Sequence, residues 1–214
     1  MKSNAPLVSI ILPCYNAERT ISRTLDDIFH QTHDHLEVIC VDDGSTDNTR
    51  NIIKERTEPI IFLSQTNKGA SAARNAGFKA SHGEFVLFCD ADVQLDRSMV
   101  EKMLSTLTHH TAAAYCYSNF KFGPHSFDLF PFDAIRLQKE NYISTMSLIR
   151  RDKFIGFDES LKRFQDWDLW KRLLANGDQG VWCPERLFSA PMQGGISKFS
   201  WKNIAKLLLN RLKY

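Results

Sequence analysis

The feature that most constrains the fold is an apolar run that stops at two acids. Residues 85–88 are Phe-Val-Leu-Phe, and after Cys89 come Asp90 and Asp92 with a single alanine between them. A run of this kind predicts a buried strand that delivers carboxylates at its C-terminal end. In open α/β sheets, ligands bind just beyond the carboxyl ends of the strands. Two carboxylates there suit a hard divalent cation, although such a pair also commonly caps a turn or a following helix.

Length and charge are those of one ordinary globular domain over residues 1–214. Hydrophobic residues make up 43% of the 214 positions, which is enough for one sizeable core. The 27 basic and 25 acidic side chains give a formal net charge of +2, which offers no electrostatic case for a nucleic-acid partner. The five cysteines are odd in number and lie mostly in apolar runs. That pattern indicates reduced, buried thiols in a cytoplasmic protein.

Strand-like and helical patterns alternate through the first half of the chain. This βαβα order predicts an α/β fold, with a mostly parallel, Rossmann-like central sheet flanked by helices on both faces. The predicted strands are 7–12, 36–41, 60–63 and the run from residue 85, and helices are expected over 18–31, from Ser45 or Thr46 to 56, from 70 to an end at Gly83, and over 96–107.

The second half is less regular. Residues 119–142 are aromatic and contain Gly123-Pro124 and Phe130-Pro131, which indicates a loop-rich or antiparallel region. Further strands are predicted near 112–117, 143–150 and 181–183, with a short helix near residue 152 and a longer one from about 166 to 177.

A parallel sheet would bring several of these loops to one edge. The segments concerned are 13–16, Asp42-Asp43 and 90–92, which follow the first, second and fourth predicted strands. The first loop lacks Gly-x-Gly-x-x-Gly and the chain lacks a Gly-Lys-Ser/Thr loop, which disfavours a redox cofactor or an ATPase. A flat base remains possible, because Tyr15 can stack on it, Asp43 can accept from a ring N–H and Arg74 can meet a phosphate or base edge.

Several spaced motifs together resemble one known family. They are Val8-Ser-Ile-Ile-Leu-Pro-Cys-Tyr-Asn16, Val41-Asp-Asp-Gly-Ser-Thr-Asp47, Asn67-Lys-Gly-Ala-Ser-Ala-Ala-Arg-Asn-Ala-Gly77 and Asp90-Ala-Asp92. In this order they resemble the inverting family 2 nucleotide-sugar glycosyltransferases of GT-A fold, and the likeness runs from about residue 7 to 178. The tract Gln165-Asp-Trp-Asp-Leu-Trp170 is similar to the family's Glu-Asp-Trp-Asp-Leu-Trp segment, with Gln165 where glutamate is usual.

The resemblance implies a donor site. Its nucleotide, most often uridine in this family, would be held by Pro13, Tyr15, Asp43 and Arg74. The Asp-x-Asp motif would be Asp90 and Asp92, with Asp92 the direct ligand of a Mg²⁺ or Mn²⁺ ion that bridges the diphosphate. The nucleotide-binding half would span about 1–95 and the acceptor and catalytic half about 96–199.

The resemblance also implies that Asp166 is the catalytic base. Such a base takes the proton of the attacking hydroxyl while the metal neutralises charge on the departing nucleotide. The alternative is that Asp166 only caps the helix it begins. Gln165 leaves the proton acceptor in place but removes a neighbouring charge.

The C-terminal segment is predicted to form an amphipathic helix over about 200–214. Trp201, Ile204, Leu208 and Leu212 fall on one helical face, with lysines and an arginine elsewhere. The helix could lie on an anionic membrane at the inner face of the cell membrane, within reach of a lipid-linked acceptor, or it could cover the domain's own core.

The resemblance, together with the acids at the sheet edge, implies an inverting hexosyl- or N-acetylhexosaminyltransferase. It would move a sugar from a nucleotide-diphosphate donor to a hydroxyl of a glycan or lipid-linked acceptor, in bacterial cell-surface polysaccharide synthesis. The expected donor is a UDP-sugar. One alternative is a sugar-phosphate nucleotidyltransferase, for which the Pro13–Asn16 loop is a poor match. Another is a non-catalytic nucleotide-binding module of the same fold.

Overall fold

The computed structural model describes residues 5–192, which form a nine-stranded sheet with helices on both faces. The strands are β1 (Val8–Cys14), β2 (Leu36–Asp42), β3 (Ile60–Ser64), β4 (Phe85–Phe88), β5 (Gln94–Leu95), β6 (Ala113–Phe122), β7 (His125–Phe127), β8 (Leu148–Arg150) and β9 (Gln179–Ala190). The helices are α1 (Ile21–Phe29), α2 (Thr49–Lys54), α3 (Ala70–Ala80), α4 (Met99–His109), α5 (Ala134–Lys139) and α6 (Gln165–Ala175), with a 3₁₀ turn at Arg151–Lys153.

The strands run in the order β3-β2-β1-β4-β8-β6-β9-β5, and β7 pairs with β6 at the side. The first four are parallel, with β1 at their centre: Val8 pairs with Leu36 of β2 on one side and with Phe85 of β4 on the other. Beyond β4 the sheet is mixed, because β8 is antiparallel to β4 and β6 while β9 runs parallel to β6. The predicted α/β fold with a largely parallel sheet is confirmed.

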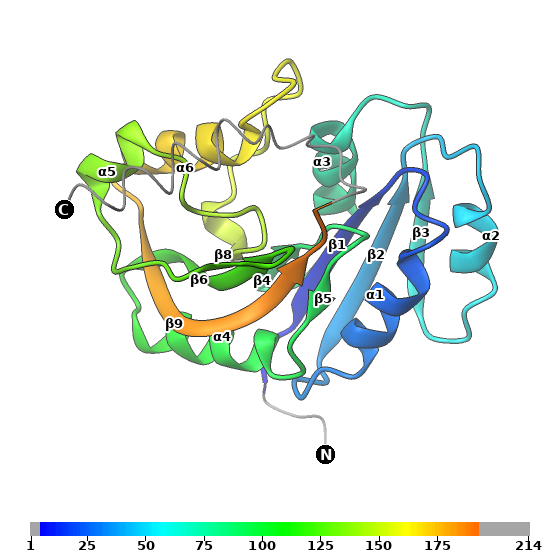
Figure 1. Ribbon diagram of the computed structural model, residues 1–214, viewed down its shortest axis with the longest axis horizontal. Coiled ribbons are helices and arrows are strands. Elements are labelled where there is room, and N and C mark those ends of the chain that lie inside the picture. The colour runs from blue at the N-terminus through cyan, green and yellow to red at the C-terminus, as the bar shows by residue number, and fades with distance from the viewer. Residues whose placement is uncertain (1–4, 193–214) are drawn as a thin grey trace.

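Two layers of apolar side chains cover the sheet. On one face, Leu25 of α1 and Met103 of α4 are fully buried against the strands. On the other face, Ala73 of α3, Leu137 of α5 and Trp170 of α6 are fully buried in a second cluster. Figure 1 shows α5 and α6 next to each other, and the arrowheads of β1 and β2 pointing toward the level of α3. Each helix therefore buries one face on the sheet.

The small-residue helix α3 lies very close to the sheet. A Cβ added at Gly77 would stand 2.4 Å from Ile11 Cγ2 and 3.2 Å from Val41 Cγ2, so only glycine allows this approach. The helix ends at Ala80, earlier than predicted. Gly83 does not end it; its N–H donates to the Ser9 hydroxyl at 2.8 Å as the chain enters β4.

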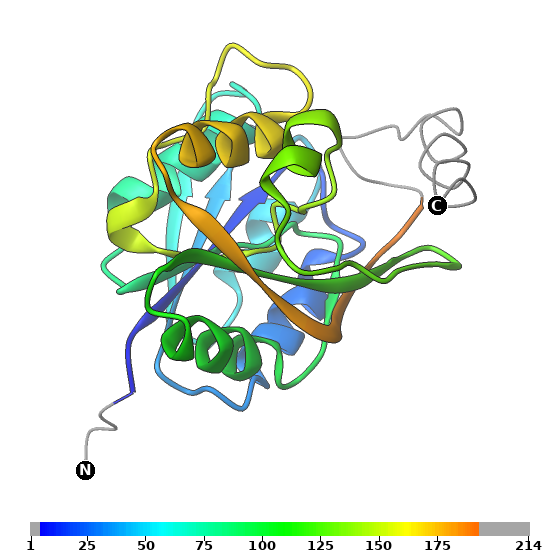
Figure 2. The same ribbon diagram turned by 90° about the vertical axis from the view of Figure 1, so that its left-hand side faces the viewer.

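The second half departs most from the predicted element bounds. Strands β6 and β9 are both longer than their apolar cores, because they pair with each other in a long parallel ladder that shifts register beside Ser118 and Asn119. Figure 2 shows β9 sweeping across the molecule and the green β6–β7 hairpin projecting from it. Strand β8 starts only at Leu148; upstream, the Ile143 carbonyl accepts from Trp170 Nε1 at 3.0 Å instead of joining a ladder.

Within residues 5–192 the structure has no helix that is both long and apolar enough to cross a membrane. The predicted amphipathic helix over about 200–214 lies outside the described residues. The division into a nucleotide-binding half over about 1–95 and an acceptor half over about 96–199 stays a prediction.

Candidate active site

The loops that follow β1, β2 and β4 meet at one edge of the sheet. The Asp43 N–H donates to the Cys14 carbonyl at 2.8 Å, which ties the end of β2 to the end of β1. The Cys89 N–H donates to the Ile11 carbonyl at 2.9 Å, which ties the segment after β4 to the same strand. The structure thus brings together the segments that the sequence predicted to share an edge.

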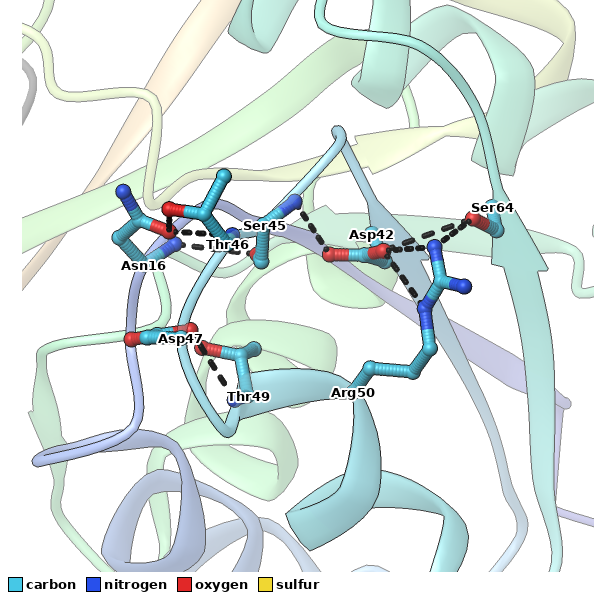
Figure 3. Close-up of polar contacts among 8 residues, drawn as sticks. All are labelled: Asn16, Asp42, Ser45, Thr46, Asp47, Thr49, Arg50 and Ser64. Carbon is cyan, nitrogen blue, oxygen red and sulfur yellow. Dashed lines mark hydrogen bonds and ion pairs between the residues drawn. The ribbon is translucent and has the colours of Figure 1, made fainter.

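Asp42, at the end of β2, carries a fully buried carboxylate (Figure 3). Its Oδ2 accepts from Arg50 Nη2 at 3.0 Å and from the Ser64 hydroxyl at 3.4 Å, and its Oδ1 accepts from the Ser45 N–H at 3.1 Å. Burial alone would raise the pKa of Asp42, but the hydrogen bonds from Ser45 and Arg50 outweigh it and lower that pKa. The charged form therefore joins β2 to α2 and β3.

The turn after β1 explains why α2 starts late. Asn16 has a left-handed backbone, with φ of 49°; its N–H donates to the Ser45 hydroxyl at 3.0 Å, and its side-chain oxygen accepts from the Thr46 N–H at 2.9 Å (Figure 3). Ser45 and Thr46 are thus used by this turn, and α2 begins at Thr49 after Asn48. The prediction that Ser45 or Thr46 caps the helix is wrong.

Of the residues predicted to hold the nucleotide, two lie on the strand β1 side of this edge. Pro13 is buried within β1. Tyr15 is 42% exposed, so its ring is available to stack on a flat ligand.

Asp43 is buried and holds the turn that begins α3. Its Oδ1 accepts from Gln65 Nε2 at 2.7 Å and from the Lys68 N–H at 2.8 Å, and its Oδ2 accepts from the Gly69 N–H at 2.8 Å. Gly69 has a φ of 93°, which glycine adopts without strain. The structure gives Asp43 this positioning role; its contact with a base ring stays a prediction.

Arg74 of α3 reaches the Asp-x-Asp turn. Its side chain is 8% exposed, and Nη2 donates to Asp90 Oδ1 at 2.7 Å. Among residues 5–192, Asp92 has no such ion pair, and burial together with the charge of Asp90 raises the pKa of Asp92. The turn itself is held from α1, because the Thr24 hydroxyl lies 2.9 Å from the Val93 carbonyl and 3.2 Å from that of Ala91.

The donor atoms at this turn fit a hard divalent cation. Asp90 and Asp92 supply only carboxylate oxygens, the ligands that Mg²⁺ and Mn²⁺ prefer. A cation would relieve the repulsion from Asp90, which after burial is the second cause of the raised pKa of Asp92. Residues 5–192 contain no group of three or more His, Cys, Asp or Glu side chains placed to share a metal ion. Diphosphate and water oxygens would have to complete the coordination.

Asp166 lies in the first turn of α6, after Gln165. The cap position belongs to Phe164, whose φ is 60°, so the alternative that Asp166 is the N-cap is wrong. Asp166 Oδ1 accepts from the Trp167 N–H at 2.8 Å and from Asn141 Nδ2 at 3.1 Å. Burial raises the pKa of Asp166, and these hydrogen bonds with the charge of Arg74 oppose that rise only in part.

Arg74 thus links the two groups of predicted acids. Its guanidinium contacts Asp90 directly, and its positive charge also acts on Asp166. A carboxyl group whose pKa is raised toward neutrality is a better general base than an ordinary aspartate. The predicted metal-binding turn and the predicted base therefore share one electrostatic environment.

Three residues that hydrogen-bond to these segments were not found by sequence reasoning. Thr24 and Asn141 have been described. The third, Asn75, fixes the loop after the 3₁₀ turn: its Oδ1 accepts from the Phe157 N–H and its Nδ2 donates to the Phe157 carbonyl, both at 2.9 Å. Asn75 lies within the Arg-Asn-Ala-Gly tract, which was the available signal. Thr24 and Asn141 carry no local signal, because their partners are distant in sequence.

The unusual Gln165 and its neighbour Asp168 both have local partners. Gln165 Nε2 donates to the Leu161 carbonyl at 3.0 Å, so the amide closes the turn that leads into α6. Asp168 Oδ2 accepts from Arg172 Nε at 2.7 Å, one helical turn further on.

Comparison with known proteins decides the family. Residues 9–163 match the model of Glycosyl transferase family 2. The chain belongs to this family. An uncharacterized glycosyltransferase of Haemophilus influenzae is 37% identical over 106 residues, which are 48% of this chain and 42% of that protein. The Escherichia coli UDP-Glc:alpha-D-GlcNAc-diphosphoundecaprenol beta-1,3-glucosyltransferase WfgD is 36% identical over 117 residues, which are 54% of this chain and 46% of that one.

Solved structures agree on the fold. Staphylococcus aureus TarS in complex with UDP superposes with a TM-score of 0.75 and 24% identity, over 86% of this chain and 60% of that chain. The mannosyltransferase PcManGT from Pyrobaculum calidifontis, in complex with GDP-Man and Mn²⁺, gives 0.71 and 16% over 99% and 66%. This likeness supports the GT-A fold. Family 2 membership also disfavours the nucleotidyltransferase alternative. The chain covers less than half of the two curated relatives named above.

The ion pair between Arg50 and Asp42 leads to a prediction about how stability depends on pH. Because the pKa of Asp42 is lowered in the folded state, Asp42 contributes stability above its unfolded pKa, and that stability is lost as pH falls through its folded pKa. Arg50→Ala should reduce the free energy of unfolding by about 1–2 kcal/mol at pH 7, a modest value because the guanidinium is half-exposed, and by less near pH 3.

Urea denaturation at the two pH values measures this difference. Lys79→Ala, which removes an exposed charge from α3, is the control and should change little at either pH. An Arg50→Ala loss of equal size at both pH values would show that the effect does not depend on the charge of Asp42.

Proposed function

We propose that this protein is a metal-dependent, inverting glycosyltransferase of bacterial cell-surface polysaccharide synthesis. It would transfer a hexosyl or N-acetylhexosaminyl group from a UDP-sugar to a hydroxyl of a glycan or lipid-linked acceptor. The observation that carries the proposal is the link through Arg74 between the Asp-x-Asp turn and Asp166. The printed name of WfgD, with a UDP-Glc donor and a diphosphoundecaprenol acceptor, supports both substrate classes.

The donor side would use the residues at the ends of β1 and β2 with α3. Tyr15 would present its exposed ring to the nucleotide base, and Pro13 is buried at the end of β1. Asp43 fixes the turn that starts α3 and so places Arg74. Arg74 then brings positive charge to the side of the site where the diphosphate would lie.

Asp92 and Asp90 would hold the divalent cation. When bound, a Mg²⁺ or Mn²⁺ ion neutralises negative charge on the departing nucleotide diphosphate. Asp92 is the better direct ligand, because Asp90 already pairs with Arg74. Asp166, as general base, would accept the proton of the acceptor hydroxyl. A lipid-linked acceptor would place the enzyme at the inner face of the cell membrane.

Nucleotide binding tests the donor site. In calorimetric titrations with UDP and GDP, UDP should bind in the presence of Mn²⁺ and not with a chelator, and Asp92→Ala should weaken that binding about 10–100-fold. Asp152→Ala, an exposed aspartate of the 3₁₀ turn, is the matched control and should bind as the wild type does. UDP affinity that is unchanged by both the chelator and Asp92→Ala would contradict the assigned metal site. Tighter binding of GDP than of UDP would contradict the assigned donor.

Turnover tests the base. Asp166→Asn should reduce UDP release from UDP-glucose or UDP-N-acetylglucosamine about 10²–10⁴-fold, because the amide cannot accept the proton, with UDP affinity unchanged. Asp168→Asn, two residues along the helix and paired with Arg172, should retain activity. Wild-type activity in Asp166→Asn would refute its role as base. Tight UDP binding by a wild-type protein that turns over neither donor would favour the non-catalytic module.

A further inference from the structure

The two carboxylate oxygens of Asp166 have different surroundings. Oδ1 accepts two hydrogen bonds, from the Trp167 N–H at 2.8 Å and from Asn141 Nδ2 at 3.1 Å. Oδ2 accepts none from any other residue within 5–192. An oxygen whose lone pairs already face two donors is poorly placed to take a further proton, whereas Oδ2 has both lone pairs available.

Packed neighbouring residues fix the position of Asn141. It lies between α5 and β8, and the next residue, Tyr142, is buried with its ring 4.7 Å from that of Phe130. The Tyr142 hydroxyl is 3.2 Å from the Asp133 N–H at the start of α5. Helix α5 is itself joined to α6, because Trp167 Nε1 donates to the Leu137 carbonyl at 2.6 Å. Both donors to Oδ1 are therefore fixed by packed elements on either side of Asp166.

The amide of Asn141 is otherwise poorly satisfied. Its own Oδ1 is buried and has no hydrogen-bond partner among the described residues. A buried amide oxygen without a partner costs stability, so general packing does not account for an asparagine here. The interaction that the side chain does make is the one with Asp166.

We propose that Asn141 is a positioning residue that holds Asp166 Oδ1 and leaves Oδ2 as the oxygen that deprotonates the acceptor. The inference rests on the proposed function. In the step, the acceptor O–H proton moves to Oδ2 and the O–H electron pair forms the new bond to the anomeric carbon. The bond from that carbon to the diphosphate oxygen breaks, and its electron pair leaves with the nucleotide diphosphate. The interaction also stabilises the charged form of Asp166.

Two substitutions separate this role from packing. Asn141→Ala deletes the donor and should move the acid limb of the kcat/KM–pH profile to higher pH, with kcat/KM on that limb reduced about tenfold. Asn141→Asp has the same shape, yet it sets a second carboxylate against Oδ1 and should cost at least as much. If Asn141 only filled space, Asn141→Ala would lower activity without moving the acid limb. Arg74 of α3, the charged group that acts on Asp166 from a packed element, is unchanged in both variants.

The ionisation of Asp166 is measured directly on the protein without donor. Its ¹³C carboxyl resonance, assigned with Asp166→Asn, should titrate at higher pH in Asn141→Ala than in the wild type. Gln138→Ala, an exposed amide of α5, is the matched control and should leave both this titration and the rate profile unchanged. UDP affinity should be the same in all variants, which separates the inference from the donor-site proposal.

The outcomes are distinct. A shift of both the resonance and the acid limb in Asn141→Ala supports the inference. An unchanged Asp166 titration in Asn141→Ala overturns it while leaving the donor site intact. A shifted titration with an unmoved acid limb also overturns it, because Asp166 would then not be the group whose ionisation limits the reaction, and the assigned base would fail with it.

Discussion

The candidate site depends on two buried carboxylates at the end of β2. Asp42 is fully buried and remains charged because Arg50 and the Ser45 N–H hydrogen-bond to it, which fixes the turn into α2. Asp43 accepts hydrogen bonds from the N–H groups of Lys68 and Gly69, which fixes the start of α3. One strand end thus determines the position of two helices. A buried charge is costly unless fully hydrogen-bonded, so these turns have little freedom to move.

Arg74 connects these turns to the acids of the candidate site. Helix α3 lies close to β1 and β2 because Gly77 has no side chain, and this close packing directs Arg74 to the Asp-x-Asp turn. Nearly buried, Arg74 pairs with Asp90 and acts on Asp166 at the same time. In the part of the chain that the structure describes, Asp92 forms no ion pair, which suits a metal ligand. Asp166 has a raised pKa, which suits a base.

Much of this architecture is predictable from sequence, because the first half of the chain is built from regular alternation. Buried parallel strands appear in the sequence as short apolar runs, and acids that follow them lie at the carboxyl edge of the sheet. Asp43, Asp90 and Asp92 could therefore be named as candidate site residues before the structure. Resemblance to a family added Asp166. The ends of the elements were less predictable. Strands β6 and β9 extend through polar residues because they pair with each other, and this pairing between distant parts of the sequence leaves no local pattern.

The hydrogen-bond partners of the candidate site were not predictable for the same reason. Thr24 looks like one more position on an amphipathic helix, and only the fold shows its hydroxyl beside the carbonyls around Asp92. Asn141 lies in an irregular region and meets Asp166 across 25 positions of sequence. Such residues act through a partner brought close by topology, so a single sequence marks the acids of a site better than the groups that orient them.

The central claim is that the acids at this edge form one metal-assisted donor site with a base beside it. Anomalous diffraction from crystals soaked with UDP and Mn²⁺ tests it most directly. The account predicts a manganese peak in contact with the Asp92 carboxylate and with the UDP phosphates. It also predicts that the uracil ring of UDP stacks on Tyr15. A peak bound elsewhere, or UDP bound away from Asp92 and Tyr15, would contradict it.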